Sequence, residues 1–354
     1  MTRTEPDPEK LEAFAERFSA DVAATLHGTT VVLGDKLGLY TALADGGPQT
    51  PAELAGRTGC QPRLIEEWCN AQAASGYCEY EPSSGRYLLT PEQAACLADP
   101  TGPAFLTGGM VVASAAHKTE ERIRTAFTGD GSLGWHEHDT DLFDGTDRFF
   151  GARYAGTLVD HWIPALDGVE ERLRSGARVA DVACGHGAST ILLARAFPAS
   201  TFCGFDYHTP SIEAARKAAA EAGVSDRVTF EVATAEDFAG EYDLTCMFNA
   251  FHEMGDPTRV AHHVLDTLAD GGTWMLVEPR AGDHPEDNHT PVGRTFYSAS
   301  TLICVPNALS QHAEDPLGAQ AGEARLRTVV EAAGFTRFRR ATETPFFVAW
   351  EVRP

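Results

Sequence analysis

The stretch Arg178-Val-Ala-Asp-Val-Ala-Cys-Gly-His-Gly187 decides the fold of the longer part of the chain. Its first five residues are mostly apolar, as expected of a buried strand. The small residues from Ala183 onward form a turn, and an alanine-rich helix follows from Ala188. A strand, a turn and a helix in this order let a ligand approach the backbone and meet the helix N-terminus. The stretch therefore predicts a ligand site at the carboxyl end of a strand.

Two acidic residues indicate which ligand fits this turn. Thr190 stands where a dinucleotide-binding turn would have its third glycine. Asp181, near the end of the first strand, would repel a pyrophosphate but attract an amino group. Asp206 ends the second strand, where an acid can accept both hydroxyls of a ribose. A nucleoside that carries an amino acid satisfies both acids, and S-adenosylmethionine is such a ligand.

The residues after this stretch alternate between short apolar runs and alanine-rich segments, which predicts a parallel sheet with helices on both faces. Near the C-terminus two runs are separated only by residues 342–345. So short a link cannot hold a crossover helix, so this last pair must be antiparallel. The predicted strands are 178–182, 201–205, 228–232, 244–248, 273–277, 336–341 and 346–352, and the predicted helices are 190–197, 211–222, 258–268 and 322–333.

The first hundred residues predict a second, mainly helical domain. Apolar residues recur at helical spacing between residues 10 and 45. Thr50-Pro-Ala-Glu53 has the form of a capped helix start. A helix over 61–75 and a hairpin of 77–80 with 86–89 then complete a winged helix-turn-helix.

The charge of this winged helix argues against DNA as its partner. Residues 45–99 contain eight acidic residues and three basic ones. The expected recognition helix carries Glu66 and Glu67 early, where contacts to phosphates and bases need Arg or Lys. We therefore predict a packing or dimerisation module, and a homodimer assembled through residues 1–105.

The segment 166–354 resembles a class I S-adenosylmethionine-dependent methyltransferase. The resemblance rests on the glycine-rich turn, on Gly204-Phe-Asp-Tyr207, on residues 229–236 and on residues 242–254. The winged helix resembles the dimerisation domain of O-methyltransferases with small-molecule substrates. The implied fold class is α/β: a Rossmann-like seven-stranded methyltransferase sheet with a C-terminal antiparallel hairpin, plus an N-terminal, mainly α winged-helix domain. The expected domains are 1–105 for dimerisation, 106–165 as a helical connector contributing to the active site, and 166–354 for methyl transfer.

The resemblance also implies which residues hold the methyl donor. In the family, the positions of Asp181, Gly185 and Gly187 hold the methionine end, that of Asp206 holds the ribose, and the segment 234–236 lines the adenine. Two positions depart from the family, because Ala183 replaces a usual glycine and Thr234 a frequent aspartate. The expected cofactor-binding residues are Asp181, Ala183, Cys184, Gly185, Gly187, Asp206, Tyr207, Ala235, Glu236 and Asn249.

His252 is the expected general base, with Glu253 as its catalytic neighbour. The strand ending at Phe248 runs into Asn249-Ala-Phe-His-Glu-Met254 at the carboxyl edge of the sheet, where ligands of open α/β sheets bind. O-methyltransferases of this architecture place a His followed by an acid here. An imidazole can accept the proton that a hydroxyl loses as it attacks a methyl carbon. The alternative is a polar His that only ends the strand.

The acceptor site is less clearly marked by the sequence. The long segment 281–320 is expected to cover the active site. The residues expected to line the acceptor pocket are Phe150, Tyr154, Trp162, Phe296, Tyr297, Cys304 and Asn307, with core packing as the alternative for each. We expect no bound metal: His136 and His138 lie in a polar stretch typical of a solvated turn, and a site of His252, Glu253 and His312 stays a minor alternative.

Composition limits the partners. The formal net charge is −23, which repels nucleic acids and anionic lipid surfaces. No apolar run is long enough for a signal or a membrane span, and the eight cysteines form no C-x-x-C pair, so we expect reduced thiols in a cytoplasmic protein. The expected function is O-methylation of a small, aromatic or apolar metabolite of secondary metabolism. C- or N-methylation, a nicotinamide-dependent oxidoreductase and a non-catalytic winged-helix regulator remain alternatives.

Overall fold

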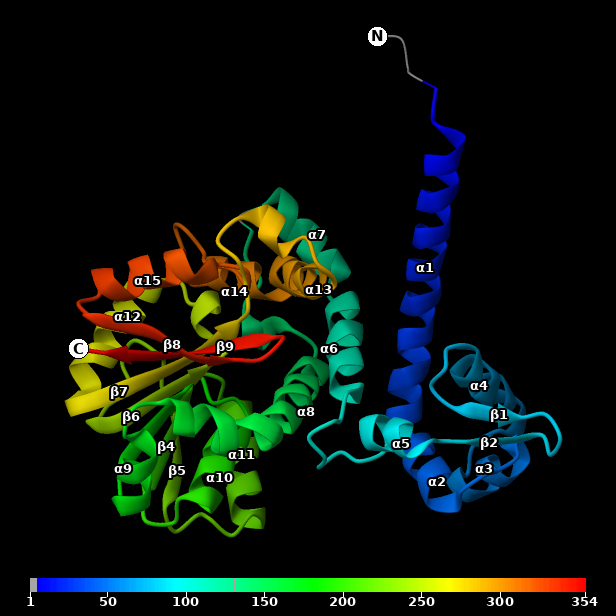
Figure 1. Cartoon of the computed structure of the whole chain (residues 1–354), viewed down its shortest axis with the longest axis horizontal. Helices are drawn as coiled ribbons and strands as arrows, with labels where there is room; N and C mark the ends of the chain where they lie inside the picture. The colour runs from blue at the N-terminus through cyan, green and yellow to red at the C-terminus, as the bar shows by residue number, and fades with distance from the viewer. Residues whose placement is uncertain (1–4, 130) are drawn as a thin grey trace. The chain divides into compact units, whose positions relative to one another are not determined.

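The computed structural model describes residues 5–129 and 131–354. The chain divides into two compact units, Met1–Ser114 and Ala115–Pro354, which are described separately (Figure 1). Helix α6 (Thr107–Lys118) crosses the boundary between them. Within the described residues, no helix is both long and apolar enough to span a bilayer.

The first unit is the predicted winged helix, preceded by a long helix. The side chains of Thr50 and Glu53 form the predicted capping box. The core of the unit gathers around Tyr40 and Trp68, whose rings meet at 5.2 Å between centroids. The elements are α1 (Pro8–Lys36), α2 (Leu39–Gly46), α3 (Pro51–Thr58), α4 (Pro62–Ala74), β1 (Glu79–Glu81), β2 (Arg86–Leu88) and α5 (Pro91–Leu97).

The second unit is built on a seven-stranded sheet in the order β5-β4-β3-β6-β7-β9-β8. The first five strands of this order pair in parallel, and β9 is antiparallel to both β7 and β8, as predicted. The strands are β3 (Arg178–Val182), β4 (Thr201–Asp206), β5 (Val228–Val232), β6 (Tyr242–Phe248), β7 (Leu268–Pro279), β8 (Arg337–Glu343) and β9 (Phe347–Arg353).

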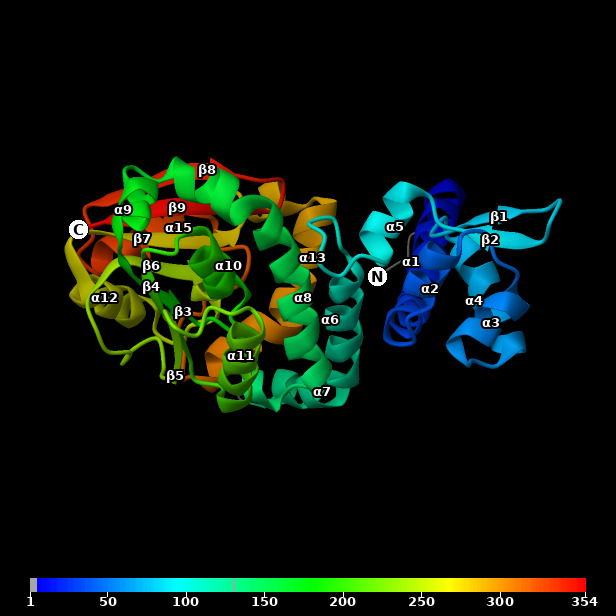
Figure 2. The same ribbon diagram turned by 90° about the horizontal axis from the view of Figure 1, so that it is seen from below.

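Helices cover both faces of this sheet, as predicted (Figure 2). Ile191 and Ile212 pack into the core on one face, and Val264 and Val330 into the core on the other. The first face carries α9 (Val169–Ser175), α10 (Ala188–Ala196) and α11 (Thr209–Glu221), and the second carries α12 (Pro257–Thr267) and α15 (Gly322–Ala332). The segment 281–320, expected to cover the active site, contains α13 (Pro291–Ala299), a π-helical turn (Ser300–Cys304) and α14 (Val305–Ser310).

Helix α8 (Thr140–Thr157) crosses the carboxyl edge of the sheet, after α7 (Glu120–Thr128). Near its start the ring of Phe143 lies 4.5 Å from that of His208, just after β4. Further along, a Cβ at Gly151 would lie 3.5 Å from Ala188 at the start of α10. Near its end Tyr154 contacts Phe248, the last residue of β6, at 5.2 Å between ring centroids. The helix therefore closes the edge at which the ligand site is expected.

Candidate active site

The glycine-rich turn between β3 and α10 adopts backbone conformations that favour small residues. The φ angles of Ala183, Gly185 and Gly187 are 58°, 54° and 81°. A residue with a Cβ loses roughly 1–2 kcal/mol in this left-handed region, which accounts for the preference for glycine at the position of Ala183. A Cβ on Gly187 would also lie 2.6 Å from the ring of Phe230, so glycine is required there. The side chain of Cys184 packs in the core, which leaves only its backbone toward a ligand.

Asp181 lies beneath this turn with 1% of its surface exposed. Its Oδ2 accepts hydrogen bonds of 2.6 Å from the hydroxyls of Ser189 and Thr190. Its Oδ1 has no hydrogen-bond partner among the described residues and remains an acceptor for a ligand donor. Burial, opposed by the two hydroxyls and aided by the charge of Asp206, raises the pKa of Asp181 to about 6. Ser189 and Thr190 were not predicted, although two adjacent hydroxyl residues at a helix start after a strand-end acid are a recognisable pattern.

Asp206 supports the same turn from the neighbouring strand. Its Oδ2 accepts the N–H of Gly185 at 3.0 Å, and its Oδ1 accepts the N–H of His208 at 2.9 Å. Burial raises the pKa of this carboxyl group as well. Each oxygen keeps a second lone pair, so the carboxylate can still accept two ribose hydroxyls. Tyr207, the next residue, is 40% exposed at the same edge.

The turn after β5 lies farther along this edge. Asp237 accepts hydrogen bonds from the N–H and the hydroxyl of Thr234, at 2.9 and 2.6 Å. Asp237, three residues after the position at which the family often has an aspartate, therefore stabilises this turn. Glu236 forms an ion pair of 3.1 Å with Arg259 of α12, and Ala235 packs against the core. In this structure the charge of Glu236 is therefore already balanced by a protein group.

His252 lies in a short turn (Phe251–Glu253) after β6, 3% exposed. Its Nδ1 forms a hydrogen bond with Oε2 of Glu278, a buried acid near the end of β7. The other oxygen of Glu278 accepts the N–H of Phe251 at 2.9 Å, which fixes the carboxylate. Burial alone lowers the pKa of His252, but the charge of Glu278, the hydrogen bond to it and the charge of Glu253 outweigh that effect and raise it. Glu278 was not predicted from the sequence.

Glu253 completes a buried polar cluster beside Nε2 of His252. Its Oε1 lies 3.7 Å from Nε2, and its Oε2 accepts a hydrogen bond of 3.1 Å from the amide of Asn307. Possible ligand atoms of His252, Glu253 and Cys304 lie within 4.8 Å of one another. However, burial and then the charge of Glu253 raise the pKa of Cys304, so its thiol keeps its proton. A hydrogen-bonded cluster accounts for these contacts, and His312 does not join it among the described residues.

Comparison with known proteins places these features in a family. Residues 173–334 match the model of a methyltransferase domain, and residues 25–99 match that of an Rv2258c-like winged HTH domain. Residues 173–334 therefore form an S-adenosylmethionine-dependent methyltransferase domain. The alternative of a nicotinamide-dependent oxidoreductase is therefore wrong.

Solved structures share the fold of this methyltransferase over nearly its whole length. An O-methyltransferase family protein from Burkholderia thailandensis is 19% identical with a TM-score of 0.69, and the match covers 99% of each chain. Human N-acetylserotonin methyltransferase in complex with SAM is 16% identical with a TM-score of 0.70, covering 100% of this chain and 99% of that one.

Curated relatives match shorter parts. 27-O-demethylrifamycin SV methyltransferase of Amycolatopsis mediterranei is 31% identical over 107 residues, 29% of this chain and 39% of that protein. The curated relatives are matched over 24% to 45% of their own lengths. Because the names of these relatives specify different acceptors, the acceptor of this methyltransferase must be argued from its own residues.

The residues expected to line the acceptor site of the methyltransferase fall into two groups. Phe150, Tyr154 and Phe296 join an aromatic cluster with Phe248 and Phe347, at ring separations of 5.2 to 6.0 Å. This cluster lies at the carboxyl ends of β6 and β7, near His252. Tyr154 and Trp162 are both buried in the core, with 6% and 1% exposed, as expected of core packing. Phe150 and Phe296 are partly buried against that core, and Tyr297 is half-buried beside Phe296. Both polar ends of Asn307 are occupied by protein groups.

The polar stretch around His136 differs from the predicted solvated turn. His138 is buried with 7% exposed, and neither ring nitrogen has a hydrogen-bond partner among the described residues. Burial lowers its pKa to about 4, so the ring is neutral at pH 7. The ring of His136 instead faces Tyr207, with Nδ1 3.4 Å from the hydroxyl. The two histidines therefore do not act as a pair.

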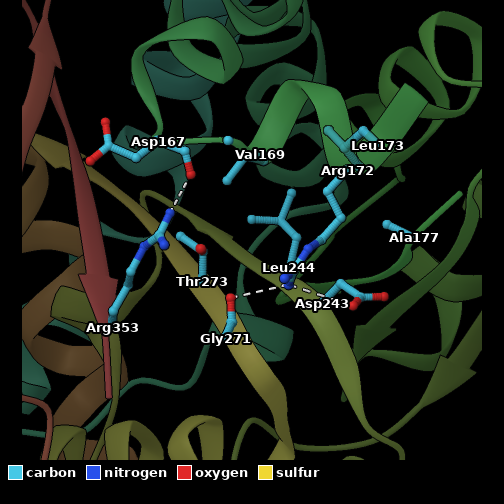
Figure 3. A pocket seen from close by; sticks show the side chains of 11 residues that line it. Asp167, Val169, Arg172, Leu173, Ala177, Asp243, Leu244, Gly271, Thr273 and Arg353 are labelled. Carbon is cyan, nitrogen blue, oxygen red and sulfur yellow. Dashed lines mark hydrogen bonds and ion pairs between the residues drawn. The ribbon is translucent and has the colours of Figure 1, made fainter. Parts of the chain in front are cut away.

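A hollow of about 240 Å³ lies at the opposite, amino edge of the sheet (Figure 3). Arg172 there donates to the carbonyl of Gly271 at 3.1 Å and lies 3.6 Å from Asp243. Arg353 donates to the backbone carbonyl of Asp167. Because both arginines have partners within the chain, this hollow lacks free charge for a ligand, unlike the carboxyl edge.

Proposed function

We propose that this methyltransferase transfers a methyl group from S-adenosylmethionine to a hydroxyl of a small aromatic or apolar molecule, with His252 as general base. The observation that carries the proposal is the buried pair of His252 and Glu278 at the same sheet edge as the glycine-rich turn. S-adenosylmethionine supplies a methyl group already activated on a sulfonium. Calorimetry with S-adenosylhomocysteine tests the donor, and methylation of phenolic acceptors tests the reaction.

The donor residues proposed from the sequence suit this ligand. The free Oδ1 of Asp181 and the turn at Gly185 and Gly187 are suited to the amino-acid end. The carboxylate of Asp206 is suited to the ribose. Asn249, at the end of β6, has a φ of 52° and both amide atoms buried without partners among the described residues, so it too can bind part of the ligand.

The proposed chemistry requires little of the protein beyond alignment and one proton transfer. Glu278 holds the Nδ1 proton of His252, which leaves Nε2 as the acceptor. As Nε2 takes the proton of the substrate hydroxyl, the carboxylate of Glu278 stabilises the imidazolium that forms. The cluster of Phe150, Tyr154 and Phe296 provides an apolar surface for the acceptor and excludes water.

Glu278→Gln will lower the pKa of His252, because it removes the charge that stabilises the imidazolium. Only the neutral imidazole accepts a proton, so the rate falls as the pH drops through the pKa of the folded protein. The acid limb of the pH–rate profile will therefore move to lower pH in the variant. Glu241→Gln, on the exposed surface, serves as control. An unchanged limb in Glu278→Gln would contradict the pairing.

The first unit is proposed to form a homodimer through α1. This helix exposes a row of large apolar side chains, 46–70% accessible, at helical spacing: Leu11, Phe14, Phe18, Val22 and Leu26. On α4, Arg63 is neutralised by ion pairs with Glu66 and Glu67, so DNA is not the partner we propose. A two-fold interface along α1 would bury this apolar row and, unlike DNA binding, would require no basic surface.

Replacing Phe14 and Phe18 by Glu will convert the dimer to a monomer at micromolar concentration, because two charges would enter an interface of about 2,000 Å². Light scattering after gel filtration measures the mass, and Glu12→Gln on the same helix is the control. A dimer that persists in the double variant, or a monomeric wild type, rules out this interface.

A further inference from the structure

Asn307 joins two parts of the second unit that are far apart in sequence. Its Oδ1 accepts the backbone N–H of Trp135 at 2.9 Å, and its Nδ2 donates to Oε2 of Glu253 at 3.1 Å. The side chain is 5% exposed, so water does not compete for these contacts. Both bonds use the amide in one orientation, with oxygen toward Trp135 and nitrogen toward Glu253.

Trp135, which donates to Oδ1 of Asn307, belongs to the segment 131–139, and this segment lies over the carboxyl edge of the sheet. Its Leu133 N–H donates to the carbonyl of Pro306 at 3.1 Å, next to Asn307. His136 faces the hydroxyl of Tyr207 at 3.4 Å, and Tyr207 directly follows the proposed ribose acid Asp206. The segment therefore touches the donor side of the edge and, through Asn307, the acid beside His252.

We propose that Asn307 is a positioning residue that ties the segment 131–139 to Glu253 and so sets the charge facing Nε2 of His252. An amide donor stabilises the carboxylate form of Glu253, and Glu253 in turn lies 3.7 Å from Nε2. When the segment 131–139 is bound to Asn307, Glu253 is therefore charged and the pKa of His252 is higher. The proposal rests on the proposed role of His252, but it concerns a charge that is measurable without turnover.

The other groups that face His252 are few. Glu278 contacts Nδ1 from β7, and the thiol of Cys304, in the π-helical turn, lies within 4.8 Å of a carboxylate oxygen of Glu253. Tyr207, after β4, also senses this acid, because the charge of Glu253 contributes to the raised pKa of Tyr207, after burial and the charge of Asp206. Among the described residues, Asn307 is the neighbour that reaches both Glu253 and the segment 131–139. Replacing it changes one hydrogen bond to Glu253 while Glu278 keeps its contact with Nδ1.

The test is the pKa of His252 in the full chain, read from the ring carbon and proton resonances of ¹³C-histidine-labelled protein. The resonance is assigned by its absence in His252→Ala. Asn307→Leu removes the donor, Glu253 becomes less charged, and the pKa of His252 will fall. In Asn307→Asp the two adjacent carboxyl groups share one proton, because like charges do not both ionise at this distance. The pair keeps one negative charge, so the pKa of His252 will stay near its wild-type value. The fall in Asn307→Leu will be about one pH unit.

Two further readouts keep the test decisive. Hydrogen exchange of residues 131–139 will quicken in Asn307→Leu, but Asn307→Asp keeps an acceptor for the N–H of Trp135 and will preserve protection. Ser298→Ala, an exposed position on α13 whose hydroxyl donates to the carbonyl of Arg294, will change neither readout. Equal pKa values of His252 in the wild type and Asn307→Leu, or a fall in Asn307→Asp as large as that in Asn307→Leu, would overturn the proposal. Failure of the wild type to bind S-adenosylhomocysteine would instead count against the proposed function.

Discussion

Replacing His252 by Ala will lower kcat by about 10²–10⁴ on a hydroxyl acceptor, while the affinity for S-adenosylhomocysteine stays near the wild-type value. The proton of the acceptor then loses the imidazole as its base, and the two neighbouring acids are held by other groups: Glu278 by the N–H of Phe251 and Glu253 by the amide of Asn307. Single-turnover methylation, with the donor saturating, measures the chemical step apart from binding.

His262→Ala provides the matched control, because His262 lies on the exposed side of α12 with 62% of its side chain accessible. That variant will turn over like the wild type. Near-wild-type turnover in His252→Ala on the true acceptor would remove the general-base role. It would favour an already neutral amine or an electron-rich carbon as the acceptor atom, for which alignment alone suffices.

Replacing Asp206 by Ala will weaken donor binding by about 10²–10⁴. Two hydrogen bonds from ribose hydroxyls to a carboxylate are each worth about 1.5–3 kcal/mol. The same change frees the N–H groups of Gly185 and His208, so the glycine-rich turn loses support as well. Calorimetry with S-adenosylhomocysteine gives the dissociation constant directly.

A comparison with Asp206→Asn separates the two effects. The amide preserves the shape of the side chain but loses its charge, so it will bind the donor more tightly than the alanine variant and less tightly than the wild type. Asp226→Ala removes an exposed acid paired with Arg227 and will leave affinity unchanged. Wild-type affinity in Asp206→Ala would show that the ribose lies elsewhere.

The sheet could be predicted from the sequence because each strand is a local apolar run. The strand 178–182 was predicted with its observed bounds. The start of β7 was missed: the strand was predicted to begin at residue 273 and Leu268 was placed in a helix, yet Leu268 pairs with Tyr242 across an irregular register. That pairing depends on a partner strand and leaves no local pattern.

The site was only partly predictable for the same reason. Asp181, Asp206 and His252 follow strands directly, so their place at the carboxyl edge could be deduced. Glu278 is hidden in the apolar run of β7, and only its partner His252 marks it as functional. Asn307 was expected to line the acceptor pocket, yet its amide contacts Trp135 and Glu253, which are distant in sequence.

The two buried carboxylates Asp181 and Asp206, on adjacent strands, also bear on the kinetics of the proposed reaction. S-adenosylmethionine carries one net positive charge, and its demethylated product carries none. The two acids therefore attract S-adenosylmethionine more strongly than its demethylated product. The other acidic residues, in excess over the basic ones, also attract the positively charged donor, over longer distances. Added salt will slow donor association while leaving product dissociation nearly unchanged. Methyl transfer removes the positive charge of the ligand, so the electrostatic attraction that retains the donor no longer retains the product.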